Sequence, residues 1–310
     1  MKVLLTGATG LIGRALASRL RRDGHEVLAF VRDEARGRQA LGAEVELLVD
    51  GEAGGAIEGA LGGVDAVLNL AGEPVAGGRW TARRKAAIYD SRINLTRRIA
   101  DALADCSPGQ APRVLVSASA VGFYGDRGSE RLGEDEPVGS GFLADVCRDW
   151  EEEARSAEDA GVRVVLARIG IVLAREGGAL EKMLPAFRAG FGGPLGNGRQ
   201  FMPWIHLDDL VESLLRALTD ERLRGPINCV APHPVQNRAF SKTLATVLRR
   251  PAFLRVPRSL LTLAVGQMSA ALLQSQRAEP QRLLDADFDF RFTSLEEALR
   301  DILSIATEAA

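Results

Sequence analysis

The stretch TGATGLIG, residues 6–13, decides the fold, because it sets three glycines between an apolar run and an amphipathic run. A helix N-terminus leaves backbone N–H groups unpaired and carries partial positive charge, so it attracts a phosphate. A backbone that turns sharply and comes close to a ligand leaves no room for side chains. We therefore expect Gly7 to supply the turn, Gly10 the close approach to a diphosphate, and Gly13 the packing of a helix on a strand.

Outward from this turn, short apolar stretches alternate with amphipathic ones along the first half of the chain. Nearly continuous apolar strands separated by helices predict a parallel sheet that is covered on both faces. The expected fold class is therefore α/β, a Rossmann-type doubly wound parallel sheet whose ligands bind outside the carboxyl ends of the strands. Strands are expected at 3–5, 27–31, 45–49, 64–70, 114–117 and 162–167, helices at 11–22, 82–104 and 143–160, and a loop or frayed helix at 50–63.

The pattern changes after residue 168 to short pieces with Gly and Pro turns, which we interpret as a smaller lobe against the carboxyl edge of the sheet. Helices are expected there near 180–190, 208–218 and 239–249, followed by two more at 257–275 and 294–304. The predicted domains are 1–170 for dinucleotide binding, 171–250 for a substrate lobe interleaved with the sheet edge, and 251–310 for a C-terminal helical extension.

The composition is that of an ordinary globular chain, with 310 residues, a formal net charge of −2 and three cysteines. This charge gives no electrostatic reason to expect a nucleic acid or an anionic membrane as a partner. The cysteines lie far apart and lack CxxC or Cys/His clustering, so neither a disulfide framework nor a metal site is expected. The first residues already belong to a strand, and no apolar run reaches bilayer length, so we expect a cytoplasmic protein.

The residue that follows the second predicted strand bears on which dinucleotide binds. In LAFVRDEARG, residues 28–37, Arg32 comes directly after the strand and Asp33 follows it. An acid at this position favours a free 2′-hydroxyl on the adenosine ribose, whereas an arginine accommodates a 2′-phosphate with its fork of donors. NADP(H) is therefore expected in preference to NAD(H), with a solvated surface arginine as the alternative interpretation of Arg32.

Further motifs point to a family. VLNLAGEP (67–74), VLVSASAVGFYG (114–125), WIHLDDL (204–210) and FRFTSLEEAL (290–299), together with TGATGLIG, resemble the extended or atypical short-chain dehydrogenase/reductase superfamily. Within it the chain is similar to the "epimerase family protein" branch, which is NAD-dependent epimerase/dehydratase-like and has a C-terminal extension. The resemblance covers essentially the whole chain.

This resemblance implies a set of cofactor-binding residues that line the carboxyl edge of the sheet. They are Gly7, Thr9, Gly10, Leu11, Ile12 and Gly13 for the diphosphate, Arg32 for the 2′-phosphate, Leu70, Ala71 and Gly72 for the adenosine ribose, Arg92 as a cofactor-side polar residue, Ser117 and Ala118 below the nicotinamide, and Gly170 with Val172 near the carboxamide.

The proton-transfer pair of the superfamily is missing. Its members carry Tyr-x-x-x-Lys, in which the lysine lowers the pKa of the phenol and also holds the nicotinamide ribose. Here the corresponding helix places Leu143 at the tyrosine position and Cys147 at the lysine position. A shift of one residue gives Phe142 and Val146, and neither register can transfer a proton.

Candidate catalytic residues are therefore Ser119, the remaining member of the usual trio, and Tyr124, on the loop that leaves the fifth strand. A packed turn aromatic is the alternative for Tyr124. Glu73 is open as an acid, a base or a ligand to a helix terminus, and Lys85 as a point charge. His206 in WIHLDDL is interpreted as a buried histidine that caps the next helix.

Two functions remain open on these grounds. The first is an NADP(H)-binding, epimerase/dehydratase-like oxidoreductase that transfers hydride to or from an unidentified small-molecule carbonyl or hydroxyl substrate. The second is a non-catalytic NADP(H)-binding sensor or interaction protein. The loop at 190–204 is expected to hold the substrate or simply to cover the sheet edge, and the apolar residues of 260–273 to pack internally or in a homodimer contact.

Overall fold

A seven-stranded, fully parallel sheet forms the centre of the computed structural model, which describes residues 1–50, 55–107 and 109–304. The strand order is β11-β7-β5-β4-β1-β2-β3, so the direction of winding reverses between β1 and β4. The sequence-based prediction of a doubly wound sheet is confirmed. The strands are β1 (Lys2–Thr6), β2 (Glu26–Val31), β3 (Glu46–Val49), β4 (Ala66–Asn69), β5 (Val114–Ala120), β7 (Arg163–Ile169) and β11 (Gly225–Cys229).

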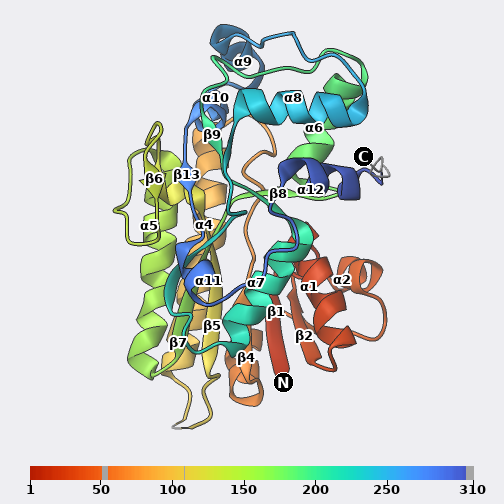
Figure 1. Ribbon diagram of the computed structural model, residues 1–310. Helices are drawn as coiled ribbons and strands as arrows, with labels where there is room; N and C mark the ends of the chain where they lie inside the picture. The colour runs from red at the N-terminus through yellow and green to blue at the C-terminus, as the bar shows by residue number, and fades with distance from the viewer. Residues whose placement is uncertain (51–54, 108, 305–310) are drawn as a thin grey trace.

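Helices cover both faces of the sheet, because alternate residues of each buried strand face opposite sides. Leu5 belongs to the core formed with α1 (Leu11–Arg22) and α7 (Leu207–Thr219), whereas its neighbour Leu4 belongs to the core formed with α4 (Ala82–Ala104) and α5 (Phe142–Arg155) (Figure 1). The remaining elements of this layer are α2 (Glu34–Leu41), α3 (Ala56–Ala60), η1 (Leu61–Gly63), η2 (Val121–Tyr124) and η3 (Ser156–Ala160).

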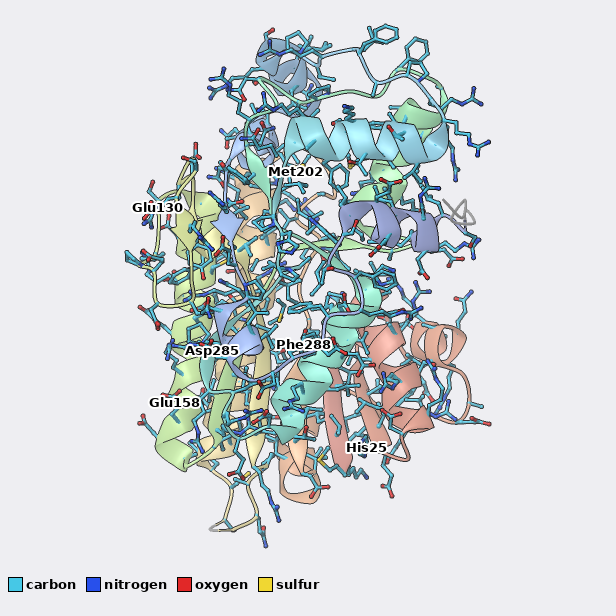
Figure 2. The ribbon with its side chains drawn as sticks, in the orientation of Figure 1. His25, Glu130, Glu158, Met202, Asp285 and Phe288 are labelled. Atoms are coloured by element: carbon cyan, nitrogen blue, oxygen red, sulfur yellow. The ribbon has the colours of Figure 1, made fainter. Side chains whose placement is uncertain are left out.

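A helical lobe lies beyond the carboxyl ends of the strands, at the top of Figure 1. Its own core joins α6 (Gly178–Arg188), α8 (Asn237–Leu248) and α12 (Leu295–Ile302) around Trp204. Figure 2 places Met202 in this region and His25 at the opposite end of the molecule. The other elements are β6 (Arg131–Leu132), β8 (Ile171–Leu173), β9 (Phe201–Met202), β10 (Trp204–His206), β12 (Val235–Gln236), α9 (Arg258–Val265), α10 (Met268–Leu273), β13 (Arg277–Ala278) and α11 (Gln281–Asp285).

Residues 171–250 are shared between the sheet layer and the lobe. The helix α7 packs on α1 and on the sheet, and β11 pairs with β7 as the seventh strand. The predicted domain division at residue 170 stays a prediction, but the sheet itself continues past it. The sequence did not reveal β11, because its five residues GPINC include a proline and show no apolar alternation.

Two predicted segments differ from the structure. The single helix expected at 257–275 is divided into α9 and α10 at Gly266, whose φ of 62° lies in the left-handed region and ends α9. The short helix α11 was not predicted. Of the loop or frayed helix expected at 50–63, residues 55–63 include α3 and η1, and 51–54 lie outside the described residues.

Candidate functional site

The turn from β1 into α1 has the geometry that its glycines predict. Gly7 has φ +68°, and a Cβ there would lie 2.7 Å from the carbonyl carbon of Leu70 at the end of β4. A Cβ on Gly13 would lie 2.2 Å from the Gly7 oxygen. Gly10 is exposed and precedes α1 with no side chain capping the helix, so the amide groups of its first turn are open to an anion.

A buried hydrogen-bond network, which the sequence analysis missed, holds this turn against β4. Thr6 Oγ1 donates to Asn69 Oδ1 at 2.7 Å and accepts from the backbone N–H groups of Leu70 and Ala71 at 3.1 and 3.2 Å. Asn69 Nδ2 in turn donates to Ser117 Oγ on β5 at 3.2 Å. The network joins the three adjacent strands β1, β4 and β5, and it uses the hydroxyl of Ser117, which is fully buried.

The Asn69 amide also connects the sheet to α4. It donates to Thr96 Oγ1 at 2.8 Å, and Trp150 Nε1 on α5 donates to the same oxygen at 2.9 Å. The side-chain amide of Asn69 thus connects three strands with α4 directly, and with α5 through Thr96. The sequence signal for this network is a polar residue in each of three apolar strands, and these residues lie too far apart in the chain to be paired by inspection.

Arg32 is exposed at the end of β2 and makes no hydrogen bond or ion pair with the described residues. Asp33 does not compete with it, because its carboxylate is the N-cap of α2 and accepts from the Arg36 N–H at 3.0 Å. Among the described residues, Arg32 is therefore the first side chain past β2 that has no partner.

Arg92 reaches from α4 to the end of β4. Its Nη1 donates to the carbonyl oxygens of Glu73 and Ile88 at 3.1 and 2.9 Å, and its Cζ lies 5.1 Å from the Trp150 ring centroid. A Cβ on Gly72 would lie 2.9 Å from that Cζ, so the guanidinium rests against the glycine. Burial lowers the pKa of Arg92.

The remaining cofactor-side residues are on the same edge. Leu70 and Ala118 pack with Ile93 and Trp150, and Leu70 and Ala71 border the Gly7 turn. A Cβ on Gly170 would lie 2.5 Å from the Pro203 oxygen, so this glycine permits β10 to approach β7. The loop after Val172 continues to Gly177 and Gly178, which contact Leu11 at the start of α1. Thr9, Leu11 and Ile12 are half-buried around this contact.

The helix α5 presents the two positions at which Tyr and Lys are missing. Gly122 in η2, the turn directly after β5, lies close to Leu143 and Cys147, since a Cβ on it would be 3.3 Å from Leu143 Cβ and 3.8 Å from Cys147 Sγ. The first of the two registers is thus the one that faces the end of β5 and η2. Burial raises the pKa of the Cys147 thiol to about 12, so this side chain is a buried neutral thiol and not a reactive thiolate.

Ser119 and Tyr124 do not present free hydroxyls. Ser119 Oγ donates to Glu151 Oε1 at 2.7 Å, and Arg168 holds that carboxylate with two hydrogen bonds. Tyr124 Oη donates to Asn228 Oδ1 at 2.7 Å and accepts from Arg168 Nη1 at 3.0 Å. All five side chains belong to one buried polar network.

The structure packs Tyr124 in the core, in agreement with the alternative interpretation of a packed turn aromatic. The strand β5 runs directly into η2, which turns the ring into a small core with Val121, Leu132, Val230 and Ala278. The ring is fully buried, and this burial raises the pKa of Tyr124 to about 12.

The other candidate groups have structural partners. His206 Nδ1 accepts from the Asp208 N–H at 3.1 Å, which confirms its interpretation as the cap of α7. The Glu73 carboxylate accepts from Arg84 Nη1 at 2.7 Å. Lys85 Nζ lies 5.1 Å from the Phe142 ring centroid and 6.0 Å from that of Trp80, so it is a cation over two aromatic rings.

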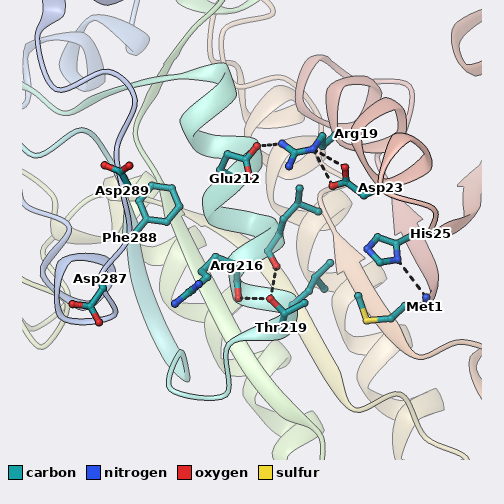
Figure 3. Close-up of a pocket in the computed structure, with 12 residues that line it drawn as sticks. Met1, Arg19, Asp23, His25, Glu212, Arg216, Thr219, Asp287, Phe288 and Asp289 are labelled. Atoms are coloured by element: carbon teal, nitrogen blue, oxygen red, sulfur yellow. Dashed lines mark hydrogen bonds and ion pairs between the residues drawn. The ribbon is translucent and has the colours of Figure 1, made fainter.

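A surface cavity of about 520 Å³ lies at the other end of the molecule (Figure 3). It is bordered by Met1 and His25, which precede β1 and β2, and by Phe288. Arg19 on α1 pairs with Asp23 at the end of the same helix and with Glu212 on α7. Ligands of doubly wound sheets bind at the carboxyl ends of the strands, so this cavity at the amino ends is not the cofactor site.

Two further findings concern the described residues. No group of three His, Cys, Asp or Glu side chains in residues 1–50, 55–107 and 109–304 is placed to hold a metal ion. In this part of the chain, no helix has both the length and the apolar composition needed to cross a bilayer. The cytoplasmic location stays a prediction.

Family models match almost the whole chain. Residues 3–229 match the model of the NAD dependent epimerase/dehydratase family, and residues 256–302 match a domain of unknown function, DUF1731. The chain belongs to the NAD-dependent epimerase/dehydratase family. Relatives in this family include the chloroplastic "Epimerase family protein SDR39U1 homolog" of Arabidopsis thaliana, 40% identical over 98% of this chain and 87% of that protein. "Epimerase family protein YfhF" of Bacillus subtilis is 36% identical over 98% of both.

Solved structures of this family agree with the fold. Human epimerase family protein SDR39U1, solved with NADPH, has a TM-score of 0.86 and 33% identity, and the match covers 99% of this chain and 100% of that one. A nucleoside-diphosphate sugar epimerase from Corynebacterium glutamicum has a TM-score of 0.76 and 35% identity over 98% of this chain and 58% of that one. The resemblance predicted from the motifs is confirmed.

We predict that Gly13→Ala lowers the free energy of unfolding by about 1–3 kcal/mol, because its Cβ forces the Gly7 carbonyl away. Thermal or urea unfolding measures the loss. Gly59→Ala in α3 is the matched control, since nothing lies within 4 Å of a Cβ there. The control should be unchanged or more stable by up to about 1 kcal/mol. Equal effects of the two substitutions would contradict the packing role of Gly13.

Tyr124 should keep its proton well above pH 10. Because the chain has two tyrosines, Tyr89→Phe leaves Tyr124 as the single phenol, and its absorbance near 295 nm reports ionisation. The folded variant should titrate near 12. An unfolded chain ionises at about 10 and the folded one later, so the stability contributed by Tyr124 is intact below about pH 10 and is lost between about 10 and 12. Ionisation of the folded variant near 10 would contradict this burial.

Proposed function

We propose that this protein binds NADP(H) and acts as an epimerase/dehydratase-like oxidoreductase. The observation that carries this proposal is the open N-terminus of α1 behind the Gly7–Gly10–Gly13 turn, at the reversal point of the sheet. The bound NADPH of human SDR39U1, a relative over the full length, supports it.

The preference for NADP(H) over NAD(H) is supported by Arg32. Its guanidinium is exposed at the end of β2 with no partner among the described residues, and the neighbouring carboxylate of Asp33 is turned into α2. A planar fork of donors at this point suits a 2′-phosphate. A free acid in the same place would instead suit the 2′-hydroxyl of NAD(H).

Different residues at the carboxyl edge of the sheet would bind different parts of NADP(H). The first-turn amides of α1 would hold the diphosphate, and Arg32 the 2′-phosphate. Leu70, Ala71 and Gly72 would line the adenosine ribose, as the resemblance implies. When bound, the cofactor supplies or accepts a hydride, and the protein positions the carbonyl or hydroxyl substrate against it.

A non-catalytic NADP(H)-binding protein is the second candidate, and one observation favours it. Positions 143 and 147 hold Leu and Cys on the α5 face that meets β5. The hydroxyls of Ser119 and Tyr124 are bound to Glu151 and Asn228 in the core. Among the described residues, neither of these two hydroxyls is therefore free to exchange a proton at this face.

The cofactor preference is tested by calorimetric titration with NADP⁺ and NAD⁺. Wild type should bind NADP⁺ more tightly, and Arg32→Ala should weaken NADP⁺ by about tenfold or more while leaving NAD⁺ nearly unchanged. Arg22→Ala, an exposed arginine at the end of α1, is the matched control. Equal affinity of wild type for both dinucleotides would remove the claim of a 2′-phosphate site.

Turnover separates the two candidate functions. NADPH oxidation is followed at 340 nm with aldehydes, ketones and nucleotide-sugar carbonyls, and NADP⁺ reduction with the matching alcohols. An oxidoreductase should turn over at least one of these classes. Tight NADP(H) binding with no turnover of any class would favour the non-catalytic protein.

A further inference from the structure

Arg92 and Arg32 lie on opposite sides of the proposed NADP(H) site. The winding of the sheet reverses between β1 and β4, and a dinucleotide bound at such a point spans it, with one nucleoside on each side. Arg32 follows β2 on one side. Arg92 rests against Gly72 just past β4, on the other side and next to α5. The two arginines thus lie on opposite sides of the diphosphate turn.

One nitrogen of the Arg92 guanidinium is hydrogen-bonded to the protein, and the other two have no partner among the described residues. Nη1 uses both its protons on the carbonyl oxygens of Glu73 and Ile88, and the Trp150 ring supports the cation from α5. Nε and Nη2 make no hydrogen bond with the described residues, and neither is a fully buried atom, so both reach solvent. A fixed, half-buried cation with unpaired donors is prepared for a polar ligand.

The place of Arg92 beside α5 indicates which part of the dinucleotide its free donors would meet. Its charge lies close enough to Cys147 to oppose the pKa rise that burial causes in the thiol. Cys147 stands at the position where the resemblance expects a lysine that holds the nicotinamide ribose. A cation from α4 therefore lies near the α5 position from which an ammonium would extend, and the side chain at that position, Cys147, is small and neutral.

We propose that Arg92 is the positioning residue for the nicotinamide ribose, and that its Nε and Nη2 donate to the vicinal hydroxyls of that ribose in place of the missing lysine. The inference rests on the proposed function, because it requires that NADP(H) is the ligand. It assigns Arg92 no proton transfer, since a guanidinium stays protonated at every pH at which the fold survives.

The test compares two ligands that differ by the nicotinamide half. NADP⁺ contains that ribose, whereas 2′,5′-ADP contains only the adenosine half with both phosphates. Arg92→Leu should weaken NADP⁺ by about 10- to 100-fold and leave 2′,5′-ADP within about twofold. Arg32→Ala should weaken both ligands. Arg155→Leu, an exposed arginine at the far end of α5, is the control and should change neither.

A rescue separates this role from a merely structural one. Arg92→Ala combined with Cys147→Lys should recover NADP⁺ affinity relative to Arg92→Ala alone, because an ammonium from α5 then enters the same space. If Arg92→Leu does not fold, Arg92→Gln, which keeps the stem and two N–H donors, takes its place in the comparison.

The outcomes are distinguishable. If wild type binds neither NADP⁺ nor 2′,5′-ADP, the proposed function itself is wrong. If wild type binds both, and the Arg92 variant binds NADP⁺ normally or loses both ligands equally, the ribose role of Arg92 is overturned while the proposed function stands. Failure of the lysine rescue in a folded double variant would show that the two positions do not share one subsite.

Discussion

The close contact between the Gly7 turn and the end of β4 is the constraint on which the rest of the structure depends. The Thr6 hydroxyl bonds three groups of β4 and its following loop, and a side chain on Gly7 would collide with Leu70. This contact brings the ends of β1 and β4 together at the reversal point of the sheet. Because both ends are fixed, the amides of α1 and the guanidinium of Arg92 face one edge without further adjustment.

Polar groups around this edge fall into two sets with different tasks. One set is buried and fully paired: Asn69 joins three strands, and Arg168 with Glu151 locks Ser119 and Tyr124 into the core. Such networks fix a single arrangement, since breaking one partner leaves another buried and unpaired. The other set, Arg32 and the Nε and Nη2 of Arg92, has donors that reach solvent and have no partner in the described part of the chain. The second set is the one available to a ligand.

Local signals in the sequence predicted much of this arrangement, and long-range partners account for most of what was missed. Each of three features can be recognised within one segment of the chain: the glycine spacing, the apolar strands, and the replacement of the Tyr-x-x-x-Lys pair by Leu143 and Cys147. The burial of Tyr124 cannot, because its partners Arg168 and Asn228 are 44 and 104 residues away. The Thr6–Asn69 bond spans 63 residues. The capping by Asp33 also has a local signal, because Asp is a residue type favoured at the N-cap of a helix.

The most direct measurement is a crystal structure of the protein grown with NADP⁺. We predict that the diphosphate lies against the first-turn amides of α1, with backbone N–H groups of Leu11 and Ile12 within hydrogen-bond distance of its oxygens. Clear density for NADP⁺ at any other place, or an unoccupied first turn at a saturating concentration of NADP⁺, would contradict the claim that this glycine turn is a dinucleotide site.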